Sequence, residues 1–407
     1  MARSNIYVGL EMGTTQVTAV VGEVKADGAI KILGIGNMPA RGVRKGEIVD
    51  NEIAAHCLQD AIRKAEERAD VAIESVYLAV AGPHLASLNH RGCVRINEDA
   101  EVTEDDLEEI KRIAKDVTIP DANAFLHTII RRYYLDGQDG VEDPVGMRGS
   151  LLEADYHIIH GIKTRLQNAI RFVRLMRLEV EDVVFGPLAA SQILLKPQDK
   201  EEGALVIDIG GGTTDYLLYD RGSVCQSGSL GVGGDHINND ISLVMKVQIQ
   251  LAERLKKEYG SAIVTDDQKK EIVLEDETRF NGREIDQDML HEIINCRIEE
   301  IFEYVKKPLE AGGYLDRIGS GIFLTGGTSL LPGIDEVAEE IFGVPVLRPN
   351  SVPINGSMSI AENPQYTTAI GLIRYAQLQD QERPPASFIQ RFGAVLGEMF
   401  GVSRVIL

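Results

Sequence analysis

The stretch Ala204-Leu-Val-Ile-Asp-Ile-Gly-Gly-Gly-Thr-Thr-Asp215 indicates the fold of this chain more clearly than any other. Its first half, Ala204–Ile209, is apolar and rich in β-branched residues, which is typical of a buried strand. Three glycines then allow a tight turn and the close approach of a ligand. Threonine hydroxyls and backbone amides suit phosphate oxygens, and the carboxylates of Asp208 and Asp215 suit a hydrated Mg²⁺. The stretch predicts a phosphate-binding turn, with a plain glycine hairpin as the alternative.

A second copy of this device lies near the N-terminus, in Ile6-Tyr-Val-Gly-Leu-Glu-Met-Gly-Thr-Thr15. Each copy continues with two β-rich runs, and a later run in each half ends in glycine. These runs are 16–24, 29–36 and 75–82 in the first half, and 215–219, 223–230 and 321–327 in the second. The repetition predicts a tandem duplication of one α/β unit, whose two turns face each other and clamp a polyphosphate.

Length and composition indicate a globular protein of two or more domains. The chain has 407 residues, of which 44% are hydrophobic and 26% charged. The net charge of −21 argues against nucleic acid as a partner, because phosphate backbones are bound by clusters of Lys and Arg. Four widely spaced cysteines are typical of reduced thiols in a cytosolic protein, and no apolar run reaches the roughly 20 residues of a membrane span.

The order of patterns predicts six parts. The first copy of the repeated unit comprises residues 1–83 and 163–195, and the second comprises 196–236 and 309–377. Each copy contains an insert: a small α+β unit at 84–162 in the first, and a helix-rich unit at 237–308 in the second. A linker follows at 378–386, and then a terminal helix at 387–403. Within these parts we expect a helix at 51–68 that Asn51 caps, and one helix over 243–259.

The terminal helix is strongly amphipathic. Its apolar residues share one face and are Phe388, Ile389, Phe392, Val395, Leu396, Met399 and Phe400. Glycines weaken the helix in water, so it should form only when that face is buried. The preceding linker favours burial in a membrane interface, with docking on the protein's own core as the alternative.

Two further motifs suit a nucleoside. Gly326-Gly-Thr328 follows a predicted strand and precedes a helix, so its backbone can approach a flat group closely. Glu253 and Lys256 lie three apart on a predicted helix and therefore share a face, from which they can reach ribose and base edges. An ordinary salt pair is the alternative for these two residues.

Together these motifs resemble the actin-like ATPase superfamily and, within it, the FtsA family of bacterial cell-division proteins. Segments that carry the narrower resemblance are 41–50, 143–149, 233–241, 252–256, 326–333 and 365–372. The resemblance implies an α/β fold of the duplicated actin-like (ribonuclease H-like) type, with two domains around a nucleotide cleft and a small inserted α+β subdomain. The parts listed above would then be subdomains 1A, 1C, 2A and 2B, the linker and a membrane-targeting helix.

The resemblance and the motifs assign the site residues by role. Phosphate contacts fall to Gly13, Thr14, Thr15, Gly210, Gly211, Gly212, Thr213 and Thr214, adenosine contacts to Gly233, Glu253, Lys256, Gly326, Gly327 and Thr328, and Mg²⁺ to Glu11 and Asp208. Glu11 stands where many relatives have Asp. No residue is identified as the base that orients an attacking water, so slow ATP turnover or none is expected.

The resemblance also implies a cellular role. Such proteins lie on the cytoplasmic face of the membrane at the division septum, tether polymers of the tubulin-like FtsZ, self-associate, and recruit later division proteins partly through subdomain 1C. The FtsZ tail would dock on residues 237–308, where Arg283 and Arg297 match positions at which a basic residue contributes. Ordinary surface arginines are the alternative for these two.

Three other actin-fold proteins compete with this interpretation: a soluble kinase, a DnaK-type chaperone, and a PilM-like protein of type IV pilus assembly. A chaperone would need a peptide-binding domain after the ATPase core, and the sequence has none. The linker and terminal helix distinguish the favoured interpretation from all three.

Overall fold

The computed structural model describes residues 6–25, 27–96, 101–264, 271–274, 284–347, 354–355 and 363–382. The first copy of the repeated unit contains a six-stranded sheet. Its strands are β1 (Ile6–Met12), β2 (Gln16–Val24), β3 (Ile30–Pro39), β6 (Ser75–Val80), β11 (Glu179–Phe185) and β18 (Ile354–Asn355), in the order β11-β6-β1-β2-β3-β18. A small hairpin of β4 (Val43–Arg44) and β5 (Glu47–Ile48) follows β3.

The second copy repeats the pairing of the first. Its strands are β12 (Ala204–Ile209), β13 (Thr214–Asp220), β14 (Ser223–Leu230) and β17 (Gly321–Thr325), in the order β14-β13-β12-β17. In each copy the first strand pairs antiparallel with the next and parallel with a later one: β1 with β2 and β6, β12 with β13 and β17. The predicted duplication and α/β class are therefore confirmed.

Helices cover the first sheet and join the two copies. They are α1 (Asn51–Ala69), α3 (Lys163–Leu175), α4 (Gly186–Leu194), α5 (Pro197–Glu202) and α11 (Thr367–Glu382). The cap of α1 is Asp50 and not the predicted Asn51, because the Asp50 carboxylate accepts hydrogen bonds from the amides of Glu52 and Ile53, both at 3.1 Å.

The predicted α+β insert is a separate four-stranded sheet with one helix. Strands β7 (Leu85–Arg95), β8 (Asn123–Leu135), β9 (Gln138–Val141) and β10 (Leu151–Ile162) lie in the order β7-β10-β8-β9, beside α2 (Glu104–Ala114). A capping box begins α2, in which Thr103 and Asp106 exchange side-chain-to-backbone hydrogen bonds. Ile110 and Leu152, both fully buried, belong to the insert's own apolar core.

The helix-rich part of the second copy contains α6 (Gly234–Met245), α7 (Ile249–Tyr259), α8 (Gln287–Ala311), α9 (Ile334–Phe342) and a hairpin of β15 (Glu271–Val273) and β16 (Glu284–Asp286). Short 3₁₀ turns lie at Leu315–Arg317, Gly327–Leu330 and Pro364–Tyr366. The single helix predicted over 243–259 is wrong. Lys246 takes a left-handed conformation (φ 52°) that ends α6, and α7 begins three residues later.

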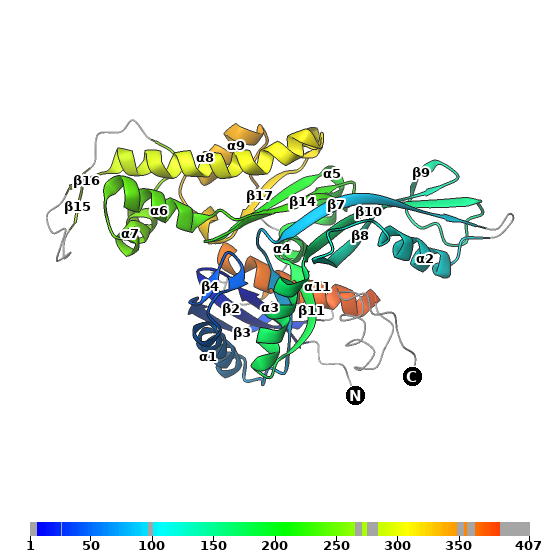
Figure 1. Cartoon of the computed structure of the whole chain (residues 1–407), viewed down its shortest axis with the longest axis horizontal. Coiled ribbons are helices and arrows are strands. Elements are labelled where there is room, and N and C mark those ends of the chain that lie inside the picture. Colours follow the sequence, from blue (N-terminus) through cyan, green and yellow to red (C-terminus); the bar gives the residue numbers. More distant parts are fainter. Residues whose placement is uncertain are drawn as a thin grey trace.

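Figure 1 shows how these parts lie. The first sheet with α1 and α3 forms the lower body, the insert extends to the upper right, and α6 to α9 lie at the upper left. Among the described residues, no helix is long and apolar enough to cross a membrane. The subdomain limits themselves stay a prediction.

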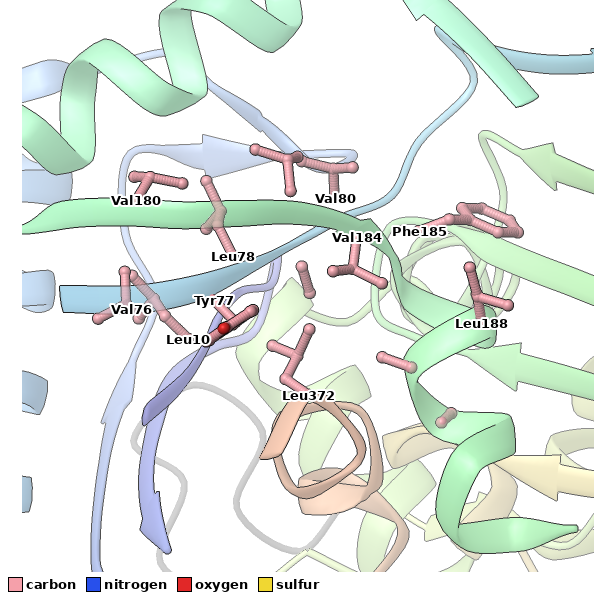
Figure 2. Close-up of a cluster of buried hydrophobic side chains, with 14 of the residues drawn as sticks. Leu10, Val76, Tyr77, Leu78, Val80, Val180, Val184, Phe185, Leu188 and Leu372 are labelled. Atoms are coloured by element: carbon pink, nitrogen blue, oxygen red, sulfur yellow. The ribbon is translucent and has the colours of Figure 1, made fainter. Parts of the chain in front are cut away.

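The main core lies where the first sheet meets α3, α4 and α11. Figure 2 shows Tyr77 of β6 and Val184 of β11 on the side of the sheet where Leu372 of α11 lies. Close packing excludes a side chain at Gly9, where a Cβ would lie 3.0 Å from both the Ala369 carbonyl carbon and Leu372 Cβ. The same helix thus fixes the strand that carries the first glycine turn.

A buried histidine joins the insert to the second copy. His157 on β10 is fully buried, with its Nδ1 2.7 Å from Asn89 Oδ1 and its Nε2 2.8 Å from Ser227 Oγ on β14. An amide oxygen only accepts, so Nδ1 carries the proton and Nε2 accepts from the serine hydroxyl. The Asn89 amide also donates to the Cys225 carbonyl (3.0 Å) on β14. The insert is therefore bonded to β14.

Burial sets the charge state of this histidine, and the pH dependence of stability follows. Burial, then Arg131 and His127, lower the pKa of His157 from 6.5 to about 3. Its stabilising contribution is therefore complete above pH 6.5 and is lost as pH falls towards the folded-state pKa. We expect His157→Gln to remove this loss, so that between pH 7 and pH 5 the urea-unfolding free energy of the native chain drops about 2 kcal/mol more than that of the variant. Parallel pH profiles for the two chains would contradict this assignment.

Candidate functional site

A cavity of about 380 Å³ lies between the two copies, at the ends of β1 and β12. Fourteen of the predicted site residues line it: Glu11, Gly13, Thr14, Thr15, Asp208, Gly210, Gly211, Gly212, Thr213, Glu253, Lys256, Gly326, Gly327 and Thr328. The volume falls within the range of about 300–1,000 Å³ that small-molecule sites occupy. The residues that the sequence motifs select therefore meet at one cleft.

The two glycine turns have the same backbone geometry. Gly13 N–H donates to the Gln16 carbonyl and Gly210 N–H donates to the Thr213 carbonyl, both at 2.9 Å. Gly13 is thus the counterpart of Gly210, and Thr14 and Thr15 are the counterparts of two glycines, not of the later threonine pair.

Contact between the turns explains that difference. A Cβ on Gly212 would lie 2.5 Å from Thr14 Oγ1 and 3.1 Å from the Lys45 backbone nitrogen, and a Cβ on Gly211 would overlap the Thr15 hydroxyl. Hydroxyls of the first turn occupy the space that side chains of the second would need. The tip of the second turn must therefore be glycine for the turns to meet.

Three carboxyl groups lie beneath the turns, of which Asp215 is buried and Glu11 and Asp208 are partly buried. Burial together with Asp208 and Asp215 raises the pKa of Glu11 to about 8, and burial raises the pKa of Asp208 to about 6 and that of Asp215 to about 7. Asp208 Oδ2 accepts from Thr368 Oγ1 at 3.0 Å, and Asp215 Oδ1 accepts from Gly82 N–H of the first copy at 3.3 Å. The cluster resists carrying three negative charges at once.

The donor set fits a hydrated cation better than a directly ligated one. In the described part of the chain, no group of three or more His, Cys, Asp or Glu is arranged to hold a metal ion. Among the described residues, Lys256 and Lys257 are the basic side chains in the cavity wall, and both belong to α7. A cation that reaches Glu11 and Asp208 through water would relieve the charge repulsion within the cluster.

The other end of the cavity is formed by α7 and the turn after β17. Lys256 Nζ donates to the Gly234 carbonyl at 2.9 Å, and burial lowers the pKa of Lys256 to about 8. Glu253 forms an ion pair with Lys257 at 2.6 Å. Gly326 has φ 85°, and a Cβ there would lie 2.5 Å from the Ile209 carbonyl, so the turn depends on glycine.

Two predicted site residues lie outside the cavity wall. The Thr214 side chain is fully buried and donates to the Val232 carbonyl at 2.9 Å, because this residue already belongs to β13. Gly233 precedes α6 and its amide donates to His236 Nδ1 at 3.2 Å, while its neighbour Gly234 lines the cavity. Both residues lie outside the wall because a regular element begins there: β13 at Thr214, and α6 directly after Gly233.

Several lining residues were not predicted, including Gln16, Asp235, Gln365 and Thr368. Thr368 lies in the first turn of α11, 160 positions along the chain from the Asp208 carboxylate that it contacts. In the sequence, the segment 365–372 only resembles an FtsA-family pattern. Sequence spacing alone gave no reason to place its hydroxyl at Asp208.

The remaining predicted residues divide between described and undescribed parts. Arg297 on α8 forms a two-pronged ion pair with Asp240 of α6, with N–O distances of 2.6 and 3.1 Å, and also contacts Glu300. Arg283 and the apolar residues of the terminal helix lie outside the described residues.

Two sheets with the same strand order, meeting at one cleft through paired glycine turns, define the actin-like class of fold. Among solved structures the chain is similar to the PilM–PilN type IV pilus biogenesis complex, with a TM-score of 0.65 and 15% identity over 93% of this chain and 99% of that one. It is also similar to MreB 5 of Spiroplasma citri bound to AMPPNP, with a TM-score of 0.52 and 17% identity over 93% and 98%. At such identities the likeness concerns the fold alone.

Sequence comparisons give the family. The family model described as cell division protein FtsA matches residues 205–371, and the SHS2 domain inserted in FtsA matches 82–160. Cell division protein FtsA of Pseudomonas aeruginosa is 38% identical over 92% of this chain and 90% of its own length, and that of Escherichia coli K12 is 34% identical over 91% and 90%. The chain belongs to the FtsA family of cell division proteins.

Proposed function

We propose that this protein binds ATP with Mg²⁺ and tethers FtsZ polymers to the cytoplasmic face of the membrane at the division septum. Membership of the FtsA family supports the division role. The observation that carries ATP binding is the pair of matching turns that meet over three carboxyl groups. The structure of MreB 5 of Spiroplasma citri, which is similar in fold and is bound to AMPPNP, is consistent with this choice of ligand.

In this proposal the two turns hold the phosphates. Backbone amides and the hydroxyls of Thr14 and Thr15 donate to phosphate oxygens, while Gly326, Gly327 and Lys256 contact the nucleoside. Bound Mg²⁺, held through water by Glu11 and Asp208, would neutralise phosphate charge. Thr368 keeps Asp208 oriented through its 3.0 Å hydrogen bond.

We propose that turnover is slow. No residue in the described cavity wall stands out as the base that would orient an attacking water, and Asp215 is already held by hydrogen bonds from Gly82 N–H and Ser229. Without such a base the attacking water is not activated, so hydrolysis should be slow. The protein would therefore act mainly through its ATP-bound state.

Membrane attachment is assigned to the segment after α11. The predicted linker at 378–386 begins too early, because 378–382 belong to α11. The rest of that linker and the helix at 387–403 would place seven apolar side chains, from Phe388 to Phe400, in the lipid interface. Since 387–403 carries one Arg and one Glu, apolar burial and not charge would supply the binding energy. Self-association, and recruitment of later division proteins through 84–162, complete the proposed role, in which nucleic acid has no part.

Arg297 is the testable part of the proposed FtsZ-tail contact. Its side chain is about a quarter exposed and Asp240 fixes its orientation. We expect Arg297→Glu to weaken binding of an FtsZ C-terminal peptide about tenfold, because a charge-assisted hydrogen bond to an acidic peptide becomes a repulsion. Fluorescence anisotropy of a labelled peptide measures this.

The control is Asp240→Asn, which removes the charge of the ion-pair partner but keeps the guanidinium. Peptide affinity should then stay equal or rise. If Arg297→Glu binds the peptide as tightly as the native chain while remaining folded, Arg297 only joins α6 to α8 and the contact lies elsewhere.

A further inference from the structure

A second cavity, also of about 380 Å³, lies beside the nucleotide cleft in the first copy. It is bounded by the turn between β4 and β5, the start of α1, the loop after β6, and one side of α3. Gly46, Ile48, Val80 and Ala169 line both cavities, so the two cavities share part of their walls. Nothing in the proposed ATP site uses this second space.

The inner wall contains a polar atom without a partner. The His84 ring is 7% exposed and lines the cavity, and its Nδ1 is buried without a hydrogen bond. The nearest charged atom, Glu47 Oε1, is 3.9 Å away, which is too long for a hydrogen bond. Because burying an unsatisfied polar atom costs about 1–3 kcal/mol, a ligand that displaces the atoms covering His84 Nδ1 and bonds to it would recover that energy.

The charge of the cavity is set by its arginines. Glu47 forms a close ion pair with Arg165, so these two groups largely cancel. Arg171 forms no ion pair within the described residues, and the amides of Asn51 and Asn168 make no described hydrogen bond. Burial lowers the pKa of His84 to about 4, which leaves its imidazole neutral near pH 7. The described groups that line the cavity therefore carry a net charge of +1 and include several hydrogen-bond donors that are not used by the protein itself.

The rest of the wall is apolar. Ile48, Val80, Phe172 and Leu175 line the cavity alongside the polar groups. Such a wall offers contact to the body of an organic molecule, while the donors offer contact to an anionic group.

We propose that this second cavity binds a small anion of the phosphate class, held by the Arg171 guanidinium, the Asn51 and Asn168 amides, and the inner imidazole of His84. A phosphate group accepts several hydrogen bonds at once and matches the fork of a guanidinium. Two sources share this chemistry: inorganic phosphate, and an organic phosphate monoester whose body contacts Phe172 and its apolar neighbours.

The test is equilibrium dialysis of the full chain against radiolabelled orthophosphate and against phenyl phosphate, with the nucleotide cleft saturated by a non-hydrolysable ATP analogue and Mg²⁺. One saturable site per chain is expected for at least one of the two probes. Tighter binding of phenyl phosphate identifies an organic monoester, and binding of orthophosphate at least as tight identifies the inorganic ion. Both results support the site.

Two variants assign the binding to this cavity. Arg171→Gln, at an exposed position that tolerates substitution, should weaken binding at least tenfold, and His84→Gln should weaken it severalfold. Arg95→Gln, an exposed arginine on β7, is the matched control and should leave affinity unchanged. The proposal is overturned if neither probe saturates a site, if both variants bind like the native chain, or if binding appears only without the ATP analogue, since the anion would then occupy the glycine turns.

Discussion

Replacing Gly212 by valine is expected to weaken ATP binding by at least ~100-fold, which corresponds to about 2.7 kcal/mol. An added Cβ would lie 2.5 Å from Thr14 Oγ1 and 3.1 Å from the Lys45 backbone nitrogen. The hydroxyl can rotate away, but the Lys45 backbone cannot move without displacing the β4–β5 hairpin. The two turns are therefore forced apart, and the phosphates lose contacts from one side. Isothermal titration with ATP and Mg²⁺ measures the change.

Gly186→Ala provides the matched control, because this glycine also lines the cavity. Its added methyl would meet nothing closer than Thr368 Cγ2 at 3.7 Å, an ordinary van der Waals distance. Affinity in this variant should stay within about threefold of the native value. Equal ATP affinity in Gly212→Val and the native chain, with both folded, would show that the turns do not clamp the phosphates.

Removing magnesium should have a comparable effect. With EDTA present, ATP affinity is expected to fall by at least ~100-fold, because the phosphates would approach the Glu11, Asp208 and Asp215 cluster without a counter-charge. In the described cavity wall both lysines belong to α7, at the nucleoside end, so no side chain there replaces the cation.

The double variant Glu11→Gln and Asp208→Asn separates this explanation from a general effect of chelation. With two of the three carboxylates neutral, ATP affinity should depend on Mg²⁺ by no more than about tenfold. A native chain that binds ATP equally well with EDTA and with Mg²⁺ would rule out the proposed role of the cluster.

Much of the fold was predictable because duplication repeats local patterns. The run of apolar and β-branched residues at 204–209, the glycines after it and the matching run near Glu11 predicted both sheets and the cleft between them. Their limits were close, since Gln16–Val24 and Ser223–Leu230 are strands over the predicted residues. The matching strand pairing in the two copies then follows from the duplication.

What the sequence did not reveal depends on contacts between distant segments. Nothing in the local pattern around Lys246 shows that this residue takes a left-handed conformation and ends α6. The sequence therefore predicts one continuous helix where the structure has α6 and α7. The matching hydrogen bonds of the two turns make Gly211 and Gly212 the counterparts of Thr14 and Thr15. Aligning the two copies by their threonine pairs instead shifts the alignment by two positions. Likewise, the bonds of His157 to Asn89 and Ser227 join strands about 70 residues apart.

A sedimentation experiment tests whether this chain links FtsZ polymers to a membrane. FtsZ polymers are mixed with lipid vesicles, Mg²⁺ and ATP, together with either the full chain or a chain that ends at Arg383. We expect the full chain to bring FtsZ into the vesicle pellet, whereas the shortened chain should leave both proteins in the supernatant while still binding FtsZ. If both forms brought FtsZ to the vesicles equally, or neither did, the terminal helix would not be the membrane anchor and the tethering role would be contradicted.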